Sequence, residues 1–197
     1  MMTALSRALV RLCGWTPEGE PPSARKYVLI AAPHTSNWDF VWVLAFARVF
    51  GVRINWVGKH TLFRRPFGTV MRWLGGIPVR RDERQSLVNT LADRLKAADA
   101  MCLVVPVEGT RGHAPNWKSG FYHIARTAGV PIVMGYLDYG AGRAGFGPAF
   151  YPTGDVRRDM DAFRAFYAGK TGKYPANSGS IRLVEESDPT VVPAAVA

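Results

Sequence analysis

Residues 26–50 read KYVLIAAPHTSNWDFVWVLAFARVF, and this stretch decides the fold. Its first seven residues, 26–32, form an apolar run that predicts a short buried strand. The run ends at Pro33, and a polar loop follows. From about Asp39 to Val49, aromatic and aliphatic residues return at most positions, which predicts a well-buried helix. The stretch therefore predicts a strand, a polar loop and a helix in direct succession.

The same alternation continues along the chain and predicts an α/β domain with a mixed, largely parallel sheet flanked by helices. Residues 1–25 are expected to form an amphipathic helix and a linker, 26–185 the main domain, and 186–197 a flexible tail. Glycine-rich residues 140–147 predict a turn. Further strands are predicted at 53–58, 75–79, 101–107, 130–137, 148–151 and 181–184. Further helices are predicted at 61–74 with an interruption at Pro66, at 86–98, at 118–128, and at 155–168 with Asp155 as N-cap.

The composition indicates a globular chain with an anionic partner. Its 197 residues are enough for one domain with a core, and 48% are apolar against 20% charged. The net charge of +10 favours binding to nucleic acid, an acidic membrane surface or a phosphorylated substrate. The two cysteines, Cys13 and Cys102, have no metal-like spacing and indicate a reducing compartment.

The N-terminal segment allows two interpretations. No apolar run is long enough to predict a transmembrane helix, and no signal peptide is recognisable. Leu5, Leu9, Leu12 and Trp15 fall near helical spacing. One interpretation is a helix packed on its own domain. The other is a helix lying on an anionic bilayer, with Trp15 at the depth of the headgroups.

His34 and Asp39 form the first candidate for catalysis. A carboxylate one turn into the helix is placed to hold the Nδ1 hydrogen of the histidine, which leaves Nε2 as a general base. This is two thirds of a Ser-His-Asp triad, and it suits a reaction whose nucleophile is a hydroxyl of the substrate. The alternative is an ordinary helix-capping loop, in which Ser36 or Asn37 caps the helix and His34 only packs.

Residues 108–111, Glu-Gly-Thr-Arg, form the second candidate. They follow a predicted strand, at a point where backbone amides and the Arg111 guanidinium can converge on a phosphate. The alternative is a polar turn with a surface ion pair. Two such motifs in this order, each after a strand, favour a binding site.

Four blocks together resemble the glycerolphosphate and lysophospholipid acyltransferases. The His-x4-Asp and Glu-Gly-Thr-Arg motifs are two of them. Residues 75–81, GGIPVRR, are similar to the family's Gly-x-Ile-Phe-Ile-Asp-Arg block, and residues 130–133, VPIV, to its Val-Pro-Ile-Val-Pro block. The chain departs from the family pattern at Pro78, Arg80, Val107 and Met134, and the reversed charge at Arg80 leaves the acceptor pocket open.

The resemblance implies an O-acyltransferase. His34 would deprotonate the acceptor hydroxyl and Asp39 would orient His34. Arg81 and Arg111 would hold an acceptor phosphate, while Glu108 would orient Arg111 or meet acceptor hydroxyls. The acyl donor would be a thioester of coenzyme A or acyl carrier protein, attacked directly in a ternary complex, with no bound cofactor and no metal. The implied substrate-binding residues are Lys59, Arg81, Glu108, Gly109, Thr110 and Arg111.

Three functions are weighed on this basis. The first is transfer of a fatty acyl group to a lysophospholipid, with lysophosphatidic acid as the simplest anionic acceptor. The second is a transacylase, or an acyltransferase for another lipid acceptor that lacks a phosphate. The third is a non-enzymatic basic domain that binds membranes or nucleic acid. We expect no nucleic acid partner, since no recognisable nucleic-acid module is present, and expect a cytoplasmic protein held peripherally on the inner face of the membrane.

Overall fold

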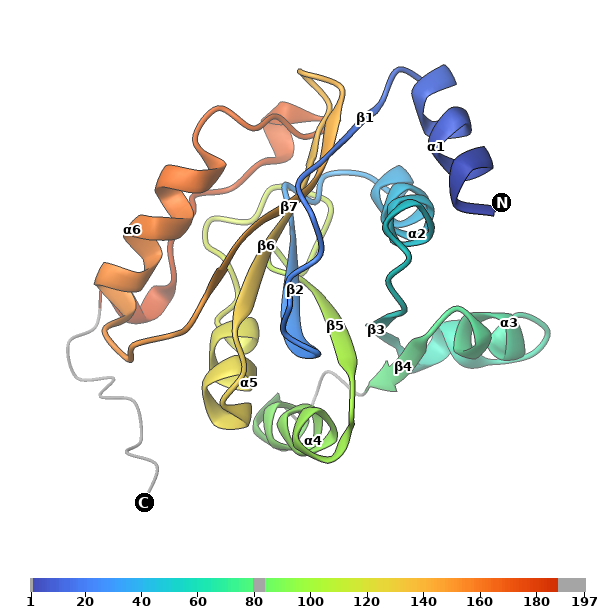
Figure 1. Cartoon of the computed structure of the whole chain (residues 1–197). Helices are drawn as coiled ribbons and strands as arrows, with labels where there is room; N and C mark the ends of the chain where they lie inside the picture. The colour runs from blue at the N-terminus through green and yellow to red at the C-terminus, as the bar shows by residue number, and fades with distance from the viewer. Residues whose placement is uncertain (1, 80–83, 188–197) are drawn as a thin grey trace.

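The computed structural model describes residues 2–79 and 84–187, with side chains from 4–79 and 87–187. Within these residues, seven strands form one sheet in the order β1-β7-β6-β2-β5-β3-β4 (Figure 1). Strands β2 to β6 are mutually parallel, whereas β7 is antiparallel to β6 and pairs in parallel with β1. The predicted fold class is confirmed. The strands are β1 Thr16–Glu18, β2 Lys26–Ala32, β3 Ile54–Lys59, β4 Gly76–Val79, β5 Met101–Pro106, β6 Ile132–Asp138 and β7 Arg143–Phe150.

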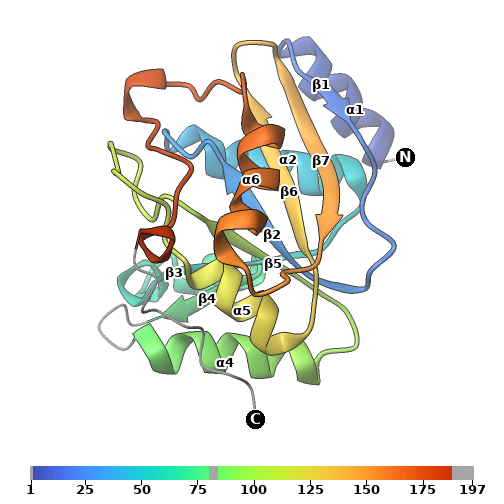
Figure 2. The ribbon, with the colours of Figure 1, turned by 90° about the vertical axis from the view of Figure 1, so that its left-hand side faces the viewer.

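Helices cover both faces of the sheet (Figures 1 and 2). Helices α1 and α2 lie over one face, with α3 beyond the sheet edge on the same side, while α5 and α6 cover the other face and α4 packs against α5. The helices are α1 Met2–Leu12, α2 Trp38–Phe50, α3 Gly68–Trp73, α4 Arg84–Ala97, α5 Gly120–Ala128 and α6 Val156–Tyr167. Short 3-10 turns occupy His60–Phe63, Pro175–Asn177 and Val184–Glu186.

The direction of two crossovers places a crevice beside the central strands. The connection from β2 to β3 passes over β5, and the connection from β5 to β6 passes back over β2. Parallel crossovers are right-handed, so connections running in opposite directions put α2 and α5 on opposite faces. The loops that leave β2 and β5 therefore diverge, and open sheets bind their ligands where such loops separate.

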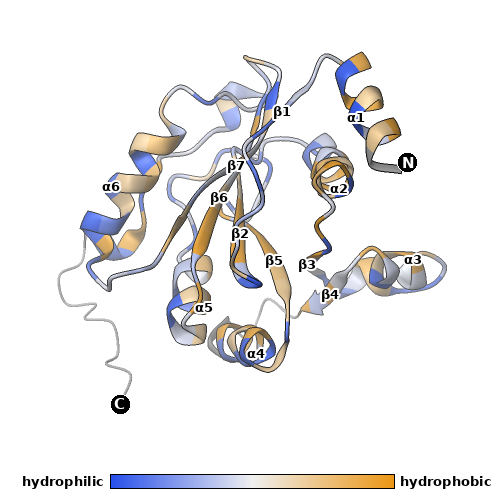
Figure 3. Ribbon diagram, viewed as in Figure 1, coloured by the Kyte–Doolittle hydropathy of each residue, from blue (hydrophilic) through white to orange (hydrophobic). Residues whose placement is uncertain are grey.

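The core follows the two-residue period of the central strands. On β2, Val28 and Ile30 join the core cluster that lies under α5 and α6, while Leu29 belongs to the cluster under α2. Strand residues point alternately to the two faces, so a strand covered on both sides is apolar throughout. Figure 3 shows this for β5 and β6, which are coloured as hydrophobic along most of their length.

Helix α1 packs on the domain with one side and exposes the other. Val10 and Trp15 are buried, at 2% and 6% exposure, whereas Leu5, Leu9 and Leu12 are strongly exposed. The predicted helix is confirmed, but the placement of Trp15 among lipid headgroups is wrong. Its indole lies inside an aromatic cluster, with ring centroids 4.9–5.8 Å from those of Trp42, Phe46 and Tyr139.

Two segments predicted as irregular contain strands. The linker over 16–25 begins with β1, a three-residue edge strand in which Pro17 is tolerated because an edge strand needs fewer hydrogen bonds. The glycine-rich turn over 140–147 gives way to β7 from Arg143 onward. At Gly145 an added Cβ would lie 1.7 Å from the Glu18 carbonyl oxygen, so this glycine permits the close approach of β1 to β7.

One predicted strand is absent. Residues 181–184 form no strand and lead into the 3-10 turn Val184–Glu186. Leu183 is buried with 1% exposure, so its apolar character reflects packing of an irregular segment on the core. The other helices and strands are confirmed to within a few residues, and Asp155 caps α6 by accepting the Arg158 backbone N–H at 3.1 Å.

In 2–79 and 84–187, no helix is long and apolar enough to cross a bilayer. The two cysteines are both free, Cys13 exposed and Cys102 buried.

Candidate active site

The loops that follow β2 and β5 lie next to each other because these two strands are neighbours in the sheet. The first loop carries His34 and leads into α2, whose first turn contains Asp39. The second loop carries Glu108, directly after β5. The structure thus brings three of the predicted site residues together at the carboxyl edge of the sheet.

Asp39 is the most heavily hydrogen-bonded side chain of the site and is only 2% exposed. Its Oδ2 lies 3.1 Å from His34 Nδ1 and accepts the backbone N–H groups of Thr35 at 2.9 Å and Ser36 at 2.8 Å. Its Oδ1 accepts the Tyr139 hydroxyl at 2.7 Å. Burial by itself raises the pKa of Asp39, but the hydrogen bonds outweigh burial and the net pKa is lowered. Asp39 is therefore an anion beside the imidazole.

The alternative of a simple capping loop does not describe this geometry. Asn37, at the N-cap position of α2, makes no side-chain cap hydrogen bond. Ser36 Oγ accepts the Trp38 backbone N–H, at 3.1 Å. The Asp39 carboxylate holds the loop backbone instead, so the group that fixes the loop also fixes the Nδ1 side of His34. Its other ring nitrogen, Nε2, is then the one placed to accept a proton.

Glu108 links the two loops and carries an electrostatic cost. It is 3% exposed, and its Oε1 accepts the backbone N–H of His34 at 3.1 Å. Its Oε2 is buried and has no hydrogen-bond partner among the described residues. Burial raises the pKa of Glu108, and the hydrogen bond from His34 offsets only part of this effect. A buried carboxylate with one unpaired oxygen is a candidate acceptor for a substrate hydroxyl.

The remaining residues of the Glu-Gly-Thr-Arg loop point away from the core. Gly109 has φ of +69°, in the left-handed region that favours glycine. Thr110 Oγ1 accepts the Gly112 backbone N–H at 3.3 Å, which tightens the turn. The Arg111 side chain is exposed, and its carbonyl oxygen accepts Asn177 Nδ2 at 3.1 Å. Within the described chain Arg111 forms no ion pair with Glu108, which binds the His34 backbone instead.

Two predicted phosphate contacts lie farther out or outside the described residues. Lys59 is exposed at the end of β3, which is separated from β2 only by β5, so it shares the carboxyl edge with His34. Arg81 lies outside the described residues, and its predicted role stays a prediction. No three His, Cys, Asp or Glu side chains converge as possible metal ligands in the described part of the chain.

The sequence analysis missed two contributions to the site. Tyr139 follows β6, and its hydroxyl reaches Asp39. The segment 171–177 crosses the loop of His34: the Tyr174 backbone N–H donates to Thr35 Oγ1 at 3.1 Å, and Lys173 Nζ lies 5.3 Å from the ring centroid of Trp38. For Tyr139 a usable signal existed, because β6 was a predicted strand and its carboxyl end reaches the same edge.

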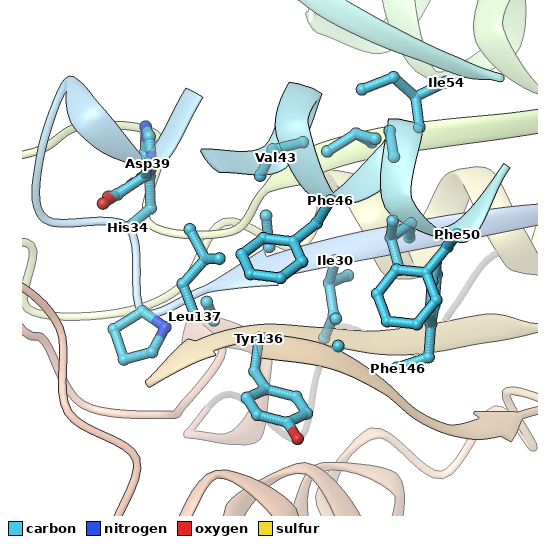
Figure 4. A pocket seen from close by; sticks show the side chains of 18 residues that line it. Ile30, His34, Asp39, Val43, Phe46, Phe50, Ile54, Tyr136, Leu137 and Phe146 are labelled. Atoms are coloured by element: carbon cyan, nitrogen blue, oxygen red, sulfur yellow. Dashed lines mark ion pairs between the residues drawn. The ribbon is translucent and has the colours of Figure 1, made fainter. Parts of the chain in front are cut away.

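An apolar cleft begins at His34 and Asp39 and runs between α2 and the sheet (Figure 4). His34 and Asp39 lie at one end, and Phe50 and Phe146 lie at the opposite end. Its volume is about 50 Å³. Between the two ends the lining is almost entirely aliphatic and aromatic, including Ile30, Val43, Phe46 and Leu137.

The family model described as Acyltransferase matches residues 16–135 of this chain. That range is more than half of the chain and contains β1 to β5, both motifs, and the loops that carry His34, Asp39 and Glu108. The chain belongs to the acyltransferase family.

Individual relatives agree with this assignment. Over 107 residues the chain is 33% identical to the 1-acyl-sn-glycerol-3-phosphate acyltransferase of Haemophilus influenzae, a match that covers 51% of this chain and 43% of that enzyme. The match therefore spans less than half of the relative's length. The crystal structure of the 1-acyl-sn-glycerophosphate (LPA) acyltransferase PlsC from Thermotoga maritima superposes with a TM-score of 0.59 at 17% identity, covering 84% of this chain and 74% of that one. At this identity the superposition supports the fold alone.

The buried Glu108 carboxylate has one oxygen without a partner among the described residues, so its charge should destabilise the folded state. We expect Glu108→Gln to raise the free energy of unfolding at pH 7 by about 1 kcal/mol, or Tm by about 2–4 °C. The reason is that burial raises the pKa of Glu108 in the folded state. At pH values above that pKa, the ionised side chain therefore destabilises the folded state. As the pH falls toward about 4, the wild-type side chain takes up its proton and the gain should fade.

Thermal unfolding from pH 7 down to pH 4 measures this effect, with Glu186→Gln as the matched control. Glu186 is also buried, but it is paired with Arg164 at 2.8 Å and accepts the Leu183 backbone N–H at 2.7 Å. Its replacement should therefore lower Tm. A Glu108→Gln protein that is less stable than wild type at pH 7, or whose gain does not change with pH, contradicts the electrostatic account.

Proposed function

We propose that this chain is an O-acyltransferase that moves a fatty acyl group from a thioester to the hydroxyl of a lysophospholipid, with lysophosphatidic acid as the acceptor. The observation that carries the proposal is the His34–Asp39 pair at the mouth of the apolar cleft. Family membership and the printed activity of the Haemophilus influenzae relative support it.

The proposed chemistry needs no nucleophile from the protein. Nε2 of His34 takes the proton from the acceptor hydroxyl as that oxygen attacks the thioester carbonyl carbon. Asp39, ionised at neutral pH, stabilises the imidazolium that forms. The tetrahedral intermediate then collapses, the carbon–sulfur bond breaks, and the thiolate leaves with the proton from His34. Acceptor and donor must be bound together, because the acyl group passes directly between them.

The cleft supports an acyl chain as the group bound beside His34. Binding of an alkyl chain is stabilised by about 0.8 kcal/mol for each methylene that leaves water. The lining from His34 to Phe146 offers such burial with almost no polar group to satisfy. At about 50 Å³ the cleft is narrow, so we infer that a long chain enters by displacing side chains of α2, such as Phe46.

The charges at the carboxyl edge support an anionic acceptor. Arg111 and Lys59 are both exposed at this edge. Arg81, outside the described residues, is predicted to be a third cation that holds the phosphate. A guanidinium holds a phosphate through two parallel hydrogen bonds. We infer that Glu108 accepts a hydroxyl of the acceptor glycerol through Oε2.

Product analysis by mass spectrometry tests the reaction. Wild-type protein incubated with lysophosphatidic acid and acyl-coenzyme A, or acyl carrier protein loaded with the same chain, should form phosphatidic acid. His34→Ala should lower the rate by about 10³-fold, since a positioned general base contributes 10²–10⁴-fold. His123→Ala is the control, because His123 lies on α5 and pairs with Glu185 at 3.5 Å, away from the cleft.

Each outcome discriminates between the functions considered. Equal product from wild type and His34→Ala contradicts the mechanism. Product from a phospholipid donor, but not from thioesters, identifies a transacylase, and product only with phosphate-free acceptors overturns the acceptor assignment. The absence of acyl transfer with every donor, together with salt-sensitive binding to nucleic acid, would favour the non-enzymatic alternative.

We also propose that the protein binds the inner face of an anionic membrane peripherally, through α1 and α3. Both helices lie on the α2 side of the molecule (Figures 1 and 2). The segment 62–73 exposes four large apolar side chains, while Arg64, Arg65 and Arg72 are exposed beside them. Exposed apolar groups among arginines suit an interface of acyl chains and anionic headgroups. The exposed apolar side chains are Leu5, Leu9 and Leu12 on α1, and Leu62, Phe67, Val70 and Trp73 around α3.

Vesicle co-sedimentation tests this surface. Wild-type protein should bind phosphatidylcholine vesicles more tightly when they contain phosphatidylglycerol, and added salt should weaken that binding. Replacing Phe67 and Trp73 together by glutamate should abolish most of the binding, because both side chains are largely exposed and lose only lipid contact. Tyr151→Glu is the control, an aromatic residue that is 64% exposed outside α1 and α3. Equal losses in both variants would overturn the assignment of this surface.

A further inference from the structure

The hydroxyl of Tyr139 occupies the one oxygen of Asp39 that does not face His34. Tyr139 lies just beyond β6, outside the range 16–135 that the family model matches. Its hydroxyl donates to Asp39 Oδ1 at 2.7 Å, while Oδ2 lies against His34 Nδ1. The carboxylate is thus held from both ends, by the phenol on one oxygen and by the imidazole and backbone amides on the other.

Tyr139 is itself held by a contact of its ring and by a hydrogen bond of its backbone. Its ring centroid lies 4.9 Å from that of Trp15 in an edge-to-face contact, and Trp15 is buried. Its backbone N–H donates to the Thr171 carbonyl oxygen at 2.8 Å. The phenol is therefore held against Asp39 before any substrate arrives, which is what a group that orients a catalytic carboxylate requires.

We propose that Tyr139 is a positioning residue for acyl transfer. Its hydrogen bond fixes the plane of the Asp39 carboxylate and withdraws part of the negative charge of Asp39 beside His34. This inference rests on the proposed function, because it assigns Tyr139 a role through the His34–Asp39 pair. Tyr139 is not among the residues that line the apolar cleft, so its role is exerted through Asp39. A hydrogen bond to an ionised carboxylate withdraws charge from it, so Tyr139 makes Asp39 a weaker partner for the imidazolium but a better-oriented one.

The surroundings of the pair bear on its pH dependence. Among the described residues, three other titratable groups lie near Asp39 and Tyr139: His34 from the loop after β2, Glu108 from the loop after β5, and Tyr174 from the segment that crosses the site. Burial, and then the hydrogen bond to Asp39, raise the pKa of Tyr139, so the phenol stays protonated and remains the donor at any pH where the enzyme works. Tyr139→Phe removes this donor and leaves the ring contact with Trp15 in place.

The test compares Tyr139→Phe with wild type in two measurements. In the acyl-transfer assay, kcat should fall about tenfold, with the KM of donor and acceptor within about twofold of wild type. The acidic limb of the kcat/KM profile should move to higher pH, because an Asp39 carboxylate without the phenol hydrogen bond stabilises the imidazolium more strongly. In the protein without substrate, the NMR titration midpoint of the His34 ring, assigned with His34→Ala, should move to higher pH by about half a unit.

Tyr122→Phe is the matched control. The Tyr122 hydroxyl also donates to a buried aspartate, Asp159, at 2.7 Å, but this pair lies between α5 and α6. Its loss should lower stability and leave the His34 titration and the acidic limb unchanged. If Tyr139→Phe behaves like Tyr122→Phe in both measurements, Tyr139 has only a structural role and the inference is wrong.

The NMR arm keeps this inference separate from the proposed function. If wild-type protein transfers no acyl group, the proposed function fails whatever the ring titration shows. If wild type and His34→Ala transfer acyl groups equally, the proposed mechanism fails. If His34→Ala is inactive while Tyr139→Phe retains the wild-type kcat, acidic limb and ring titration, only the role of Tyr139 fails.

Discussion

The carboxylate of Asp39 is the interaction on which the site depends. A buried anion is costly unless donors surround it, and this one has two backbone amides, an imidazole and a phenol. Those donors come from the loop after β2 and from the end of β6. Satisfying the charge therefore fixes the loop, aims His34 and ties two strands together at the carboxyl edge. The geometry of the proposed base and the local folding of the loop depend on the same contacts.

The sheet topology explains why such a site forms beside β2. Crossovers in opposite directions from β2 and β5 put α2 and α5 on opposite faces. The loops diverge, so not every polar group at this edge has a hydrogen-bond partner in the described part of the chain. Glu108 shows the consequence, since one of its oxygens holds the His34 backbone and the other has no partner within the described residues. The apolar cleft under α2 begins at the same point, next to His34 and Asp39.

Much of this arrangement was predictable from the sequence, because it is encoded locally. The apolar run over 26–32 and the helix after it are periodic patterns, and the observed β2 and α2 agree with them closely. The contact between His34 and Asp39 follows from a spacing of five residues across a strand-to-helix loop. Contacts between distant segments were predictable only as far as the sheet edge that each strand reaches, and not to the residue. Tyr139 is 100 residues from Asp39, and no local pattern marks its hydroxyl as a partner.

Other errors have the same origin. Trp15 follows an amphipathic helix and suited a membrane interface, yet it is buried by aromatic residues of α2. Two roles were expected for Glu108, and the first, orienting Arg111, is not seen among the described residues because Oε1 accepts the His34 backbone N–H instead. The glycines over 140–147 suggested a turn, although Gly145 serves the close pairing of β7 with β1. In each case tertiary packing, which a local pattern does not contain, decided the outcome.

The central claim is that His34 and Asp39 act as one unit, and a double-mutant cycle on acyl transfer tests it most directly. The rates of wild type, His34→Ala, Asp39→Asn and the double variant are compared, with circular dichroism to confirm that each is folded. If Asp39 acts only through His34, the double variant should be about as slow as His34→Ala alone. If the loss in the double variant equals the product of the two single losses, the residues act independently and the account is contradicted.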